Sequence, residues 1–171
     1  MTERSLTVTW DDPASGAEAA REMSGLEYLR AMARAELPGV PMASLMGFGV
    51  AEIEEGRVIF ECVPGEQHYN PIGSVHGGLA CTLFDSAMGC AVHSALPAGV
   101  GYTTVELKVN FLRPISVQTG KLSCEGTTIH VGGRIATAEA RLTDEAGKLY
   151  GHATTTCMIF RGDSPSVGEG G

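Results

Sequence analysis

The longest apolar stretch of the chain runs from Gly77 to Leu96, where nearly every residue is apolar or small. Its length, and the proline that follows at position 97, predict a helix that is hydrophobic on nearly all sides and therefore buried. Asp85 lies near its middle and would cost about 3 kcal/mol on membrane-insertion scales, so a core helix is favoured over a membrane span. Because a buried acid needs a partner or a function, Asp85 is the first candidate functional residue.

A two-residue period follows this helix. Between Thr104 and Phe111, the apolar Val105, Leu107, Val109 and Phe111 alternate with polar residues, which predicts a half-buried strand that ends at Pro114. The other predicted elements are a helix capped by Ser24 and Glu27, a hairpin over residues 47–53 and 58–63, and strands over residues 117–129, 134–143 and 149–160. Four successive strands with short connections favour an antiparallel sheet, which would curl around the apolar helix while a second copy covers the rest.

Length and composition favour one soluble domain. The 171 residues suffice for a single core, over residues 22–161, with a flexible arm at 1–21 and a disordered Gly/Ser/Pro-rich tail at 162–171. A formal net charge of −8 opposes bulk binding to nucleic acid or to acidic membranes. An anionic ligand would therefore have to be met by individual Lys or Arg side chains.

The five cysteines show no C-x-x-C spacing and lie mostly in apolar patterns, which favours reduced core thiols in a cytoplasmic protein. The first 21 residues contain no apolar segment of the signal-peptide kind. The histidines at 68, 93, 130 and 152 lack metal-ligand spacing, so no metal is predicted. No G-x-S-x-G motif supports a serine nucleophile.

The segment His76-Gly77-Gly78 lies where the long helix begins. A helix start offers unpaired backbone N–H groups and a dipole that favours negative charge, and glycine permits close approach of a ligand. With Asp85 as the attacking group or its base, these residues predict a site that polarises a carbonyl and attacks it. Gly77 and Asp85 are eight residues apart, or about 12 Å along one helix, so both can act on one carbonyl only if two antiparallel helices meet across a two-fold axis. We therefore predict an obligate dimer with two shared sites.

The segments 70–78 (NPIGSVHGG) and 104–114 (TVELKVNFLRP), with Asp85 between them, resemble the hotdog-fold acyl-CoA thioesterases of the PaaI-like type. The resemblance covers roughly residues 45–160. It implies an α+β hotdog fold, in which a curved antiparallel sheet wraps a long central helix, and homodimers that pair into tetramers. It also implies an acyl-CoA substrate, hydrolysed to free acid and CoA, with no further cofactor.

The resemblance assigns roles residue by residue. It makes Asp85 the nucleophile or general base, and it makes Asn70 and Gly77 the residues that shape the site and bind the thioester oxygen or water. Thr104 stands where some members have a serine that helps to hold the water. His76 is expected to cap the helix or position its loop rather than to act as a base. Arg113 and Arg134 are candidates for the CoA phosphates.

Alternatives remain open at this point. Asp85 could be a structural acid, and Asn70 a simple turn residue before Pro71. A hotdog hydratase or dehydratase would pair His76 with Asp85 for proton transfer, and a non-catalytic acyl-CoA binder would use the same pocket without turnover. The apolar Leu83, Phe84 and Met88 next to Asp85 point to an aliphatic or aryl acyl group.

Overall fold

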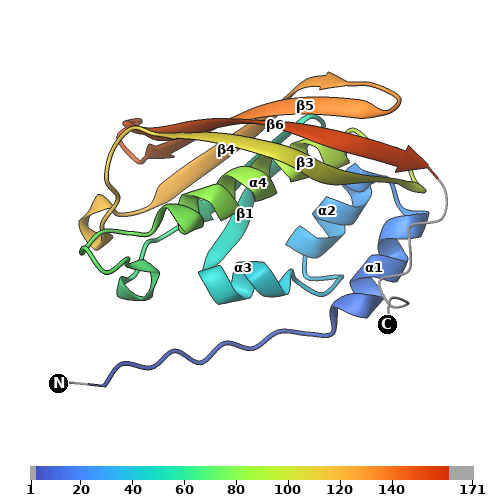
Figure 1. The fold of residues 1–171 in the computed structure, drawn as a ribbon. Coiled ribbons are helices and arrows are strands. Elements are labelled where there is room, and N and C mark those ends of the chain that lie inside the picture. Colours follow the sequence, from blue (N-terminus) through green and yellow to red (C-terminus); the bar gives the residue numbers. More distant parts are fainter. Residues whose placement is uncertain (1–2, 162–171) are drawn as a thin grey trace, which may run out of the picture.

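The computed structural model describes residues 3–161, so the predicted tail at 162–171 lies outside the described residues. A six-stranded antiparallel sheet arches over the long helix α4 (Gly77–Ser94), and the three N-terminal helices lie below it (Figure 1). The strands are β1 (Phe48–Glu54), β2 (Arg57–Cys62), β3 (Val100–Phe111), β4 (Leu122–Val131), β5 (Ile135–Asp144) and β6 (Leu149–Arg161). The predicted antiparallel sheet and central helix are confirmed.

The order of strands in the sheet is β1-β2-β4-β5-β6-β3. Strands β4, β5 and β6 form a meander, but β3 pairs with β6 and becomes an edge strand. Two short 3-10 helices, Glu66–His68 and Val117–Thr119, lie in the connections before α4 and before β4. Among residues 3–161, none of the helices combines the length and the hydropathy needed to cross a bilayer.

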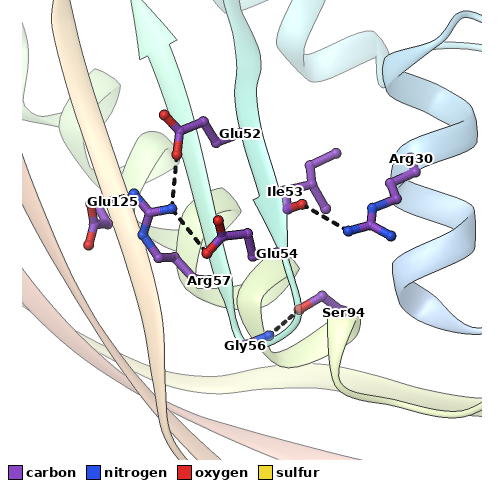
Figure 2. A network of polar contacts seen from close by, with 8 residues as sticks. All are labelled: Arg30, Glu52, Ile53, Glu54, Gly56, Arg57, Ser94 and Glu125. Atoms are coloured by element: carbon purple, nitrogen blue, oxygen red, sulfur yellow. Dashed lines mark hydrogen bonds and ion pairs between the residues drawn. The ribbon is translucent and has the colours of Figure 1, made fainter.

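Helix α4 packs closely on the sheet because its sheet-facing side chains are apolar and Gly126 of β4 lets the two backbones approach. A Cβ at Gly126 would lie 2.4 Å from the Ala87 carbonyl carbon. The far end of α4 is fastened to the β1–β2 turn, where the Ser94 hydroxyl accepts the Gly56 N–H at 2.8 Å (Figure 2). On the outside of the same hairpin, Arg57 bridges Glu52 and Glu125. The position of α4 relative to the sheet is thereby defined at both its middle and its end.

The N-terminal helices are α1 (Pro13–Glu22), α2 (Gly25–Ala33) and α3 (Pro41–Met46). The predicted capping box of α2 is confirmed, with Ser24 and Glu27 bonded to each other's backbone N–H groups. Helix α1 lies inside the segment expected to be a flexible arm. Asp12 caps it by accepting the Ala14 N–H at 2.9 Å, and its small residues lack the apolar period that would have predicted a helix.

Strand β3 departs from the predicted regular alternation. Thr104 pairs with Cys157 and Glu106 pairs with Thr156, so Val105 is an extra residue with no partner. Such a bulge shifts the side-chain alternation by one residue. Val105 is consequently 55% exposed, whereas Leu107 packs against the core and Thr104 also faces α4, where it bonds to Asp85. The prediction that Val105 shares a face with Leu107 is wrong for this reason.

Candidate active site

The start of α4 is shaped by His76, which occupies the N-cap position with φ −63° and ψ 135°. Its Nδ1 accepts the Gly78 N–H at 2.8 Å, so the predicted capping role is confirmed. A neutral imidazole that accepts at Nδ1 carries its proton at Nε2. The exposed edge of His76 is therefore a hydrogen-bond donor, and it has no free acceptor nitrogen with which to act as a base.

Gly77 is the first residue of α4, and within residues 3–161 its N–H has no acceptor. It opens on a groove of about 500 Å³, whose lining residues are Val75, His76, Gly77, Ala80, Phe111, Leu112, Arg113, Pro114 and Ile115. The Phe111 ring packs on Gly77, since a Cβ there would lie 3.1 Å from Phe111 Cζ. The unpaired donor, the helix dipole and the groove together form a place where a carbonyl oxygen can bind.

Asp85 lies just over two turns along α4 from the capped start. Its sequence context predicts a buried side chain, and this prediction is wrong for the single chain. In the single chain it is exposed, because its stripe of α4 faces the open edge beside β3 rather than the covered face of the sheet. The Thr104 hydroxyl donates to Asp85 Oδ1 at 2.8 Å, so the fold unites these two predicted residues across 19 positions of sequence. The second carboxylate oxygen is left available for chemistry.

Cys90, which lies on the same helix, does not compete with Asp85 as an attacking group. Burial first, and the Asp85 carboxylate second, raise the pKa of the Cys90 thiol to about 12. A thiol with that pKa stays protonated near neutral pH and is a poor nucleophile. Within residues 3–161, no group of three His, Cys, Asp or Glu side chains is arranged to hold a metal ion.

Asn70 closes the loop that leads into α4. Its Oδ1 accepts the N–H groups of Ile72 and Ser74 at 3.0 and 3.2 Å, and its Nδ2 donates to Ser74 Oγ at 3.0 Å. The next residues are fixed in turn, with the His76 N–H bonded to the His68 carbonyl at 2.7 Å. Asn70 thus shapes the approach to Gly77, with one amide N–H still free to bind a ligand.

The predicted site residues fall into two groups in the single chain. His76, Gly77 and Arg113 lie at the groove, with Asn70 in the loop that precedes it. Asp85 lies eight residues after Gly77, about 12 Å along α4. Thr104 of β3 lies next to Asp85, to which it is hydrogen-bonded. One chain therefore does not bring the donor and the carboxylate to one point.

The two arginines separate in the same way. The Arg113 N–H bonds to the Tyr150 carbonyl, and the Arg134 carbonyl accepts the Ile159 N–H. Residues 150 and 159 of β6 are nine positions, or about 30 Å, apart along the strand. Arg113 thus accompanies Gly77, while Arg134 lies at the end of the sheet nearer Asp85. The Arg113 guanidinium also donates to the Leu149 carbonyl.

One expectation about the surroundings of Asp85 is wrong. Leu83, Phe84 and Met88 are fully buried in the chain's own core, so they cannot contact an acyl group; in a helix covered by a sheet, proximity in sequence does not mean a shared face. Phe111 and Tyr102 are not among the predicted site residues, but they lie beside α4 on either side of Asp85, Phe111 at Gly77 and Tyr102 at Gly89. The Tyr102 hydroxyl is over Gly89, where a Cβ would be 2.7 Å away.

The known proteins that this chain resembles are thioesterases and esterases. The model of the Thioesterase superfamily matches residues 72–150. A candidate esterase of Halobacterium salinarum is 34% identical over 133 residues, covering 71% of this chain and 86% of the relative. The 1,4-dihydroxy-2-naphthoyl-CoA hydrolase of Listeria monocytogenes is 25% identical over 104 residues, or 61% and 83% of the two chains. The crystal structure of a candidate thioesterase from Ralstonia eutropha, a phenylacetic acid degradation-related protein, has a TM-score of 0.70 and 28% identity, covering 77% of this chain and 98% of its own.

Proposed function

Because this chain belongs to the thioesterase superfamily and is a thioester hydrolase of hotdog fold, we propose that its substrate is an acyl-CoA, hydrolysed to a free acid and CoA. The PaaI-like resemblance carried by residues 70–78, Asp85 and 104–114 is confirmed at the level of family. A CoA thioester as substrate is supported by the Listeria relative, which is named as a CoA hydrolase.

The observation that carries the proposal is the hydrogen bond from Thr104 Oγ1 to Asp85 Oδ1, at 2.8 Å. A carboxylate held through one oxygen presents the other in a fixed direction. That oxygen can attack the thioester carbon directly, or it can take a proton from a water molecule that attacks. In either case Thr104 orients the attacking group before the substrate arrives.

The Gly77 N–H supplies the second requirement of thioester hydrolysis. As the nucleophile adds to the carbonyl carbon, negative charge develops on the carbonyl oxygen, and a donor aimed at that oxygen lowers the barrier. The Gly77 N–H has no acceptor within residues 3–161 and lies at the positive end of the α4 dipole. It therefore suits an oxyanion without sacrificing a native hydrogen bond.

The separation of about 12 Å between Gly77 and Asp85 along one straight helix supports a shared site. We propose that two chains pair with their α4 helices antiparallel, so that Gly77 of one copy and Asp85 of the other flank one thioester. The same pairing would bring Arg113 of one copy and Arg134 of the other toward one CoA, because each arginine accompanies a different half. Both guanidinium groups would bind its phosphates. Association of two such dimers into a tetramer is part of the proposal.

The test is the release of thiol from a panel of aliphatic and aryl acyl-CoAs. We expect Asp85→Asn to lower kcat by at least about 10²-fold, the range seen when a positioned base is lost. Glu139→Gln, which removes an exposed acid from β5, is the matched control and should leave kcat unchanged. Unchanged turnover in Asp85→Asn would overturn the assignment. Enoyl-CoA hydration followed by absorbance, or tight acyl-CoA binding without thiol release, would replace it with a hydratase or a binding protein.

A further inference from the structure

The direction of Thr104 depends on the bulge at Val105. If β3 alternated regularly, Thr104 would share a face with Glu106 and would lie opposite Leu107. The extra residue makes Thr104 and Leu107 both face α4, and only then can the Thr104 hydroxyl reach Asp85. A one-residue slip would turn Thr104 away from Asp85 or turn Leu107 out of the core. The bulge is thus a condition for the site, not a local irregularity of an edge strand.

Thr155 of the neighbouring strand β6 stabilises this bulge. Its hydroxyl donates to the Glu106 carbonyl at 2.6 Å, directly beside the unpaired residue, and it pairs in register with Leu107. Thr155 is only 2% exposed, so no ligand competes for this hydroxyl. Because a bulge disrupts the backbone ladder locally, a buried side-chain donor at this carbonyl fixes the Glu106–Leu107 peptide plane, next to the bulge.

Cys157 continues the contact from Thr155 to Thr104. It is fully buried, stands two residues from Thr155 on the same face of β6, and is the register partner of Thr104. Burial raises the pKa of the Cys157 thiol, so this side chain stays uncharged beside Thr104. The strand register and the two hydroxyl hydrogen bonds therefore place Asp85, Thr104, Cys157, Thr155 and the Glu106 carbonyl in succession from the helix to the bulge.

We propose that Thr155 is a positioning residue for thioester hydrolysis, which holds the bulge that aims Thr104 at Asp85. The proposal rests on the proposed function, because it needs Thr104 and Asp85 to act at the reacting carbonyl. Thr155 itself touches neither substrate nor the carboxylate. Its loss should therefore reduce the rate of the chemical step and leave substrate binding unchanged.

The test compares Thr155→Val, which keeps the shape and removes the hydroxyl, with Thr155→Ser, which keeps the hydroxyl. Misplacement of a catalytic group by about 1 Å can cost up to about 10²-fold, so we expect kcat of Thr155→Val to fall about tenfold with KM within about twofold. Thr155→Ser should restore most of the loss. Thr154→Val, on the exposed face of the same strand, is the matched control and should behave as the wild type.

A double-mutant cycle separates positioning from general destabilisation. If Thr155 acts only through Thr104, Thr155→Val should cost little once Thr104 is already Val, because coupled residues are not additive. An equal loss of kcat in both backgrounds, or a loss that Thr155→Ser does not rescue, would overturn the proposal. Melting temperatures of all variants identify any that have failed to fold, and Thr155→Ala, which also removes the hydroxyl, takes the place of Thr155→Val in the cycle if that variant is among them.

The same experiment distinguishes failure of this inference from failure of the proposed function. If Asp85→Asn and Thr104→Val lower kcat while Thr155→Val does not, the hydrolase mechanism stands and the role of Thr155 is wrong. If Asp85→Asn leaves kcat unchanged, the mechanism itself is wrong.

Discussion

Replacing Gly77 by proline would remove one backbone N–H and leave the start of α4 intact. Gly77 is the first residue of α4, a position where proline is tolerated because its N–H has no helical partner. The preceding residue already has the extended conformation that proline requires, with φ −63° and ψ 135° at His76. Within residues 3–161 this N–H bonds to nothing, so the substitution breaks no native hydrogen bond.

The expected loss follows from the role proposed for that N–H. Removing one donor from an oxyanion site costs about 10²–10³-fold in kcat, or about 3–4 kcal/mol of transition-state stabilisation. The added side chain has a separate, smaller effect, because a Cβ at Gly77 would lie 3.1 Å from Phe111 Cζ. Gly77→Ala adds the same Cβ and keeps the N–H, so the ratio of the two variants reports the loss of the donor together with the ring carbon that replaces its hydrogen.

The assay is steady-state thiol release from the best acyl-CoA of the panel, with kcat and KM measured for wild type, Gly77→Ala and Gly77→Pro. Melting temperatures should agree within a few degrees, since proline suits the helix start. We expect Gly77→Ala to lie close to wild type and Gly77→Pro to lie at least about 10²-fold below it. Equal kcat values for the two variants would refute the oxyanion role of Gly77.

Three further predictions concern assembly, packing and pH. Refolding equal amounts of Asp85→Asn and Gly77→Pro chains together should restore about a quarter of wild-type activity, because half of the dimers are mixed and each keeps one intact site; activity equal to the mean of the parents would contradict shared sites. Gly126→Ala places a Cβ 2.4 Å from the Ala87 backbone and should lower the free energy of unfolding by about 1–3 kcal/mol in denaturant titrations, whereas Gly133→Ala, with nothing within 4 Å, should not. Burial lowers the pKa of His93 below 6.5, so its neutral form supports stability that is lost as pH falls below about 6.5; His93→Gln should flatten the fall in melting temperature between pH 7 and pH 5, and an identical fall in both proteins would exclude His93 as its source.

Much of the secondary structure of this protein can be predicted from local sequence. The apolar run from Gly77 onward and the hairpin ends predict α4, β1 and β2 within a residue or two, and the capping box at Ser24 predicts the start of α2. His76 as a helix cap follows from its place before two glycines. These features depend on neighbours three or four residues away, and so the pattern of a single segment is enough to predict them.

The placement of the site depends on contacts between distant segments. The apolar period of β3 indicates a strand, but it does not reveal its pairing with β6, the bulge at Val105 or the hydroxyl of Thr155 that holds it. Likewise, an all-apolar helix shows that Asp85 is unusual without showing that its face lies beside an open edge. The period of a segment shows which of its sides is apolar. Its strand register, and whether another segment buries that side, depend on the neighbouring segment, which only the folded chain brings into contact with it.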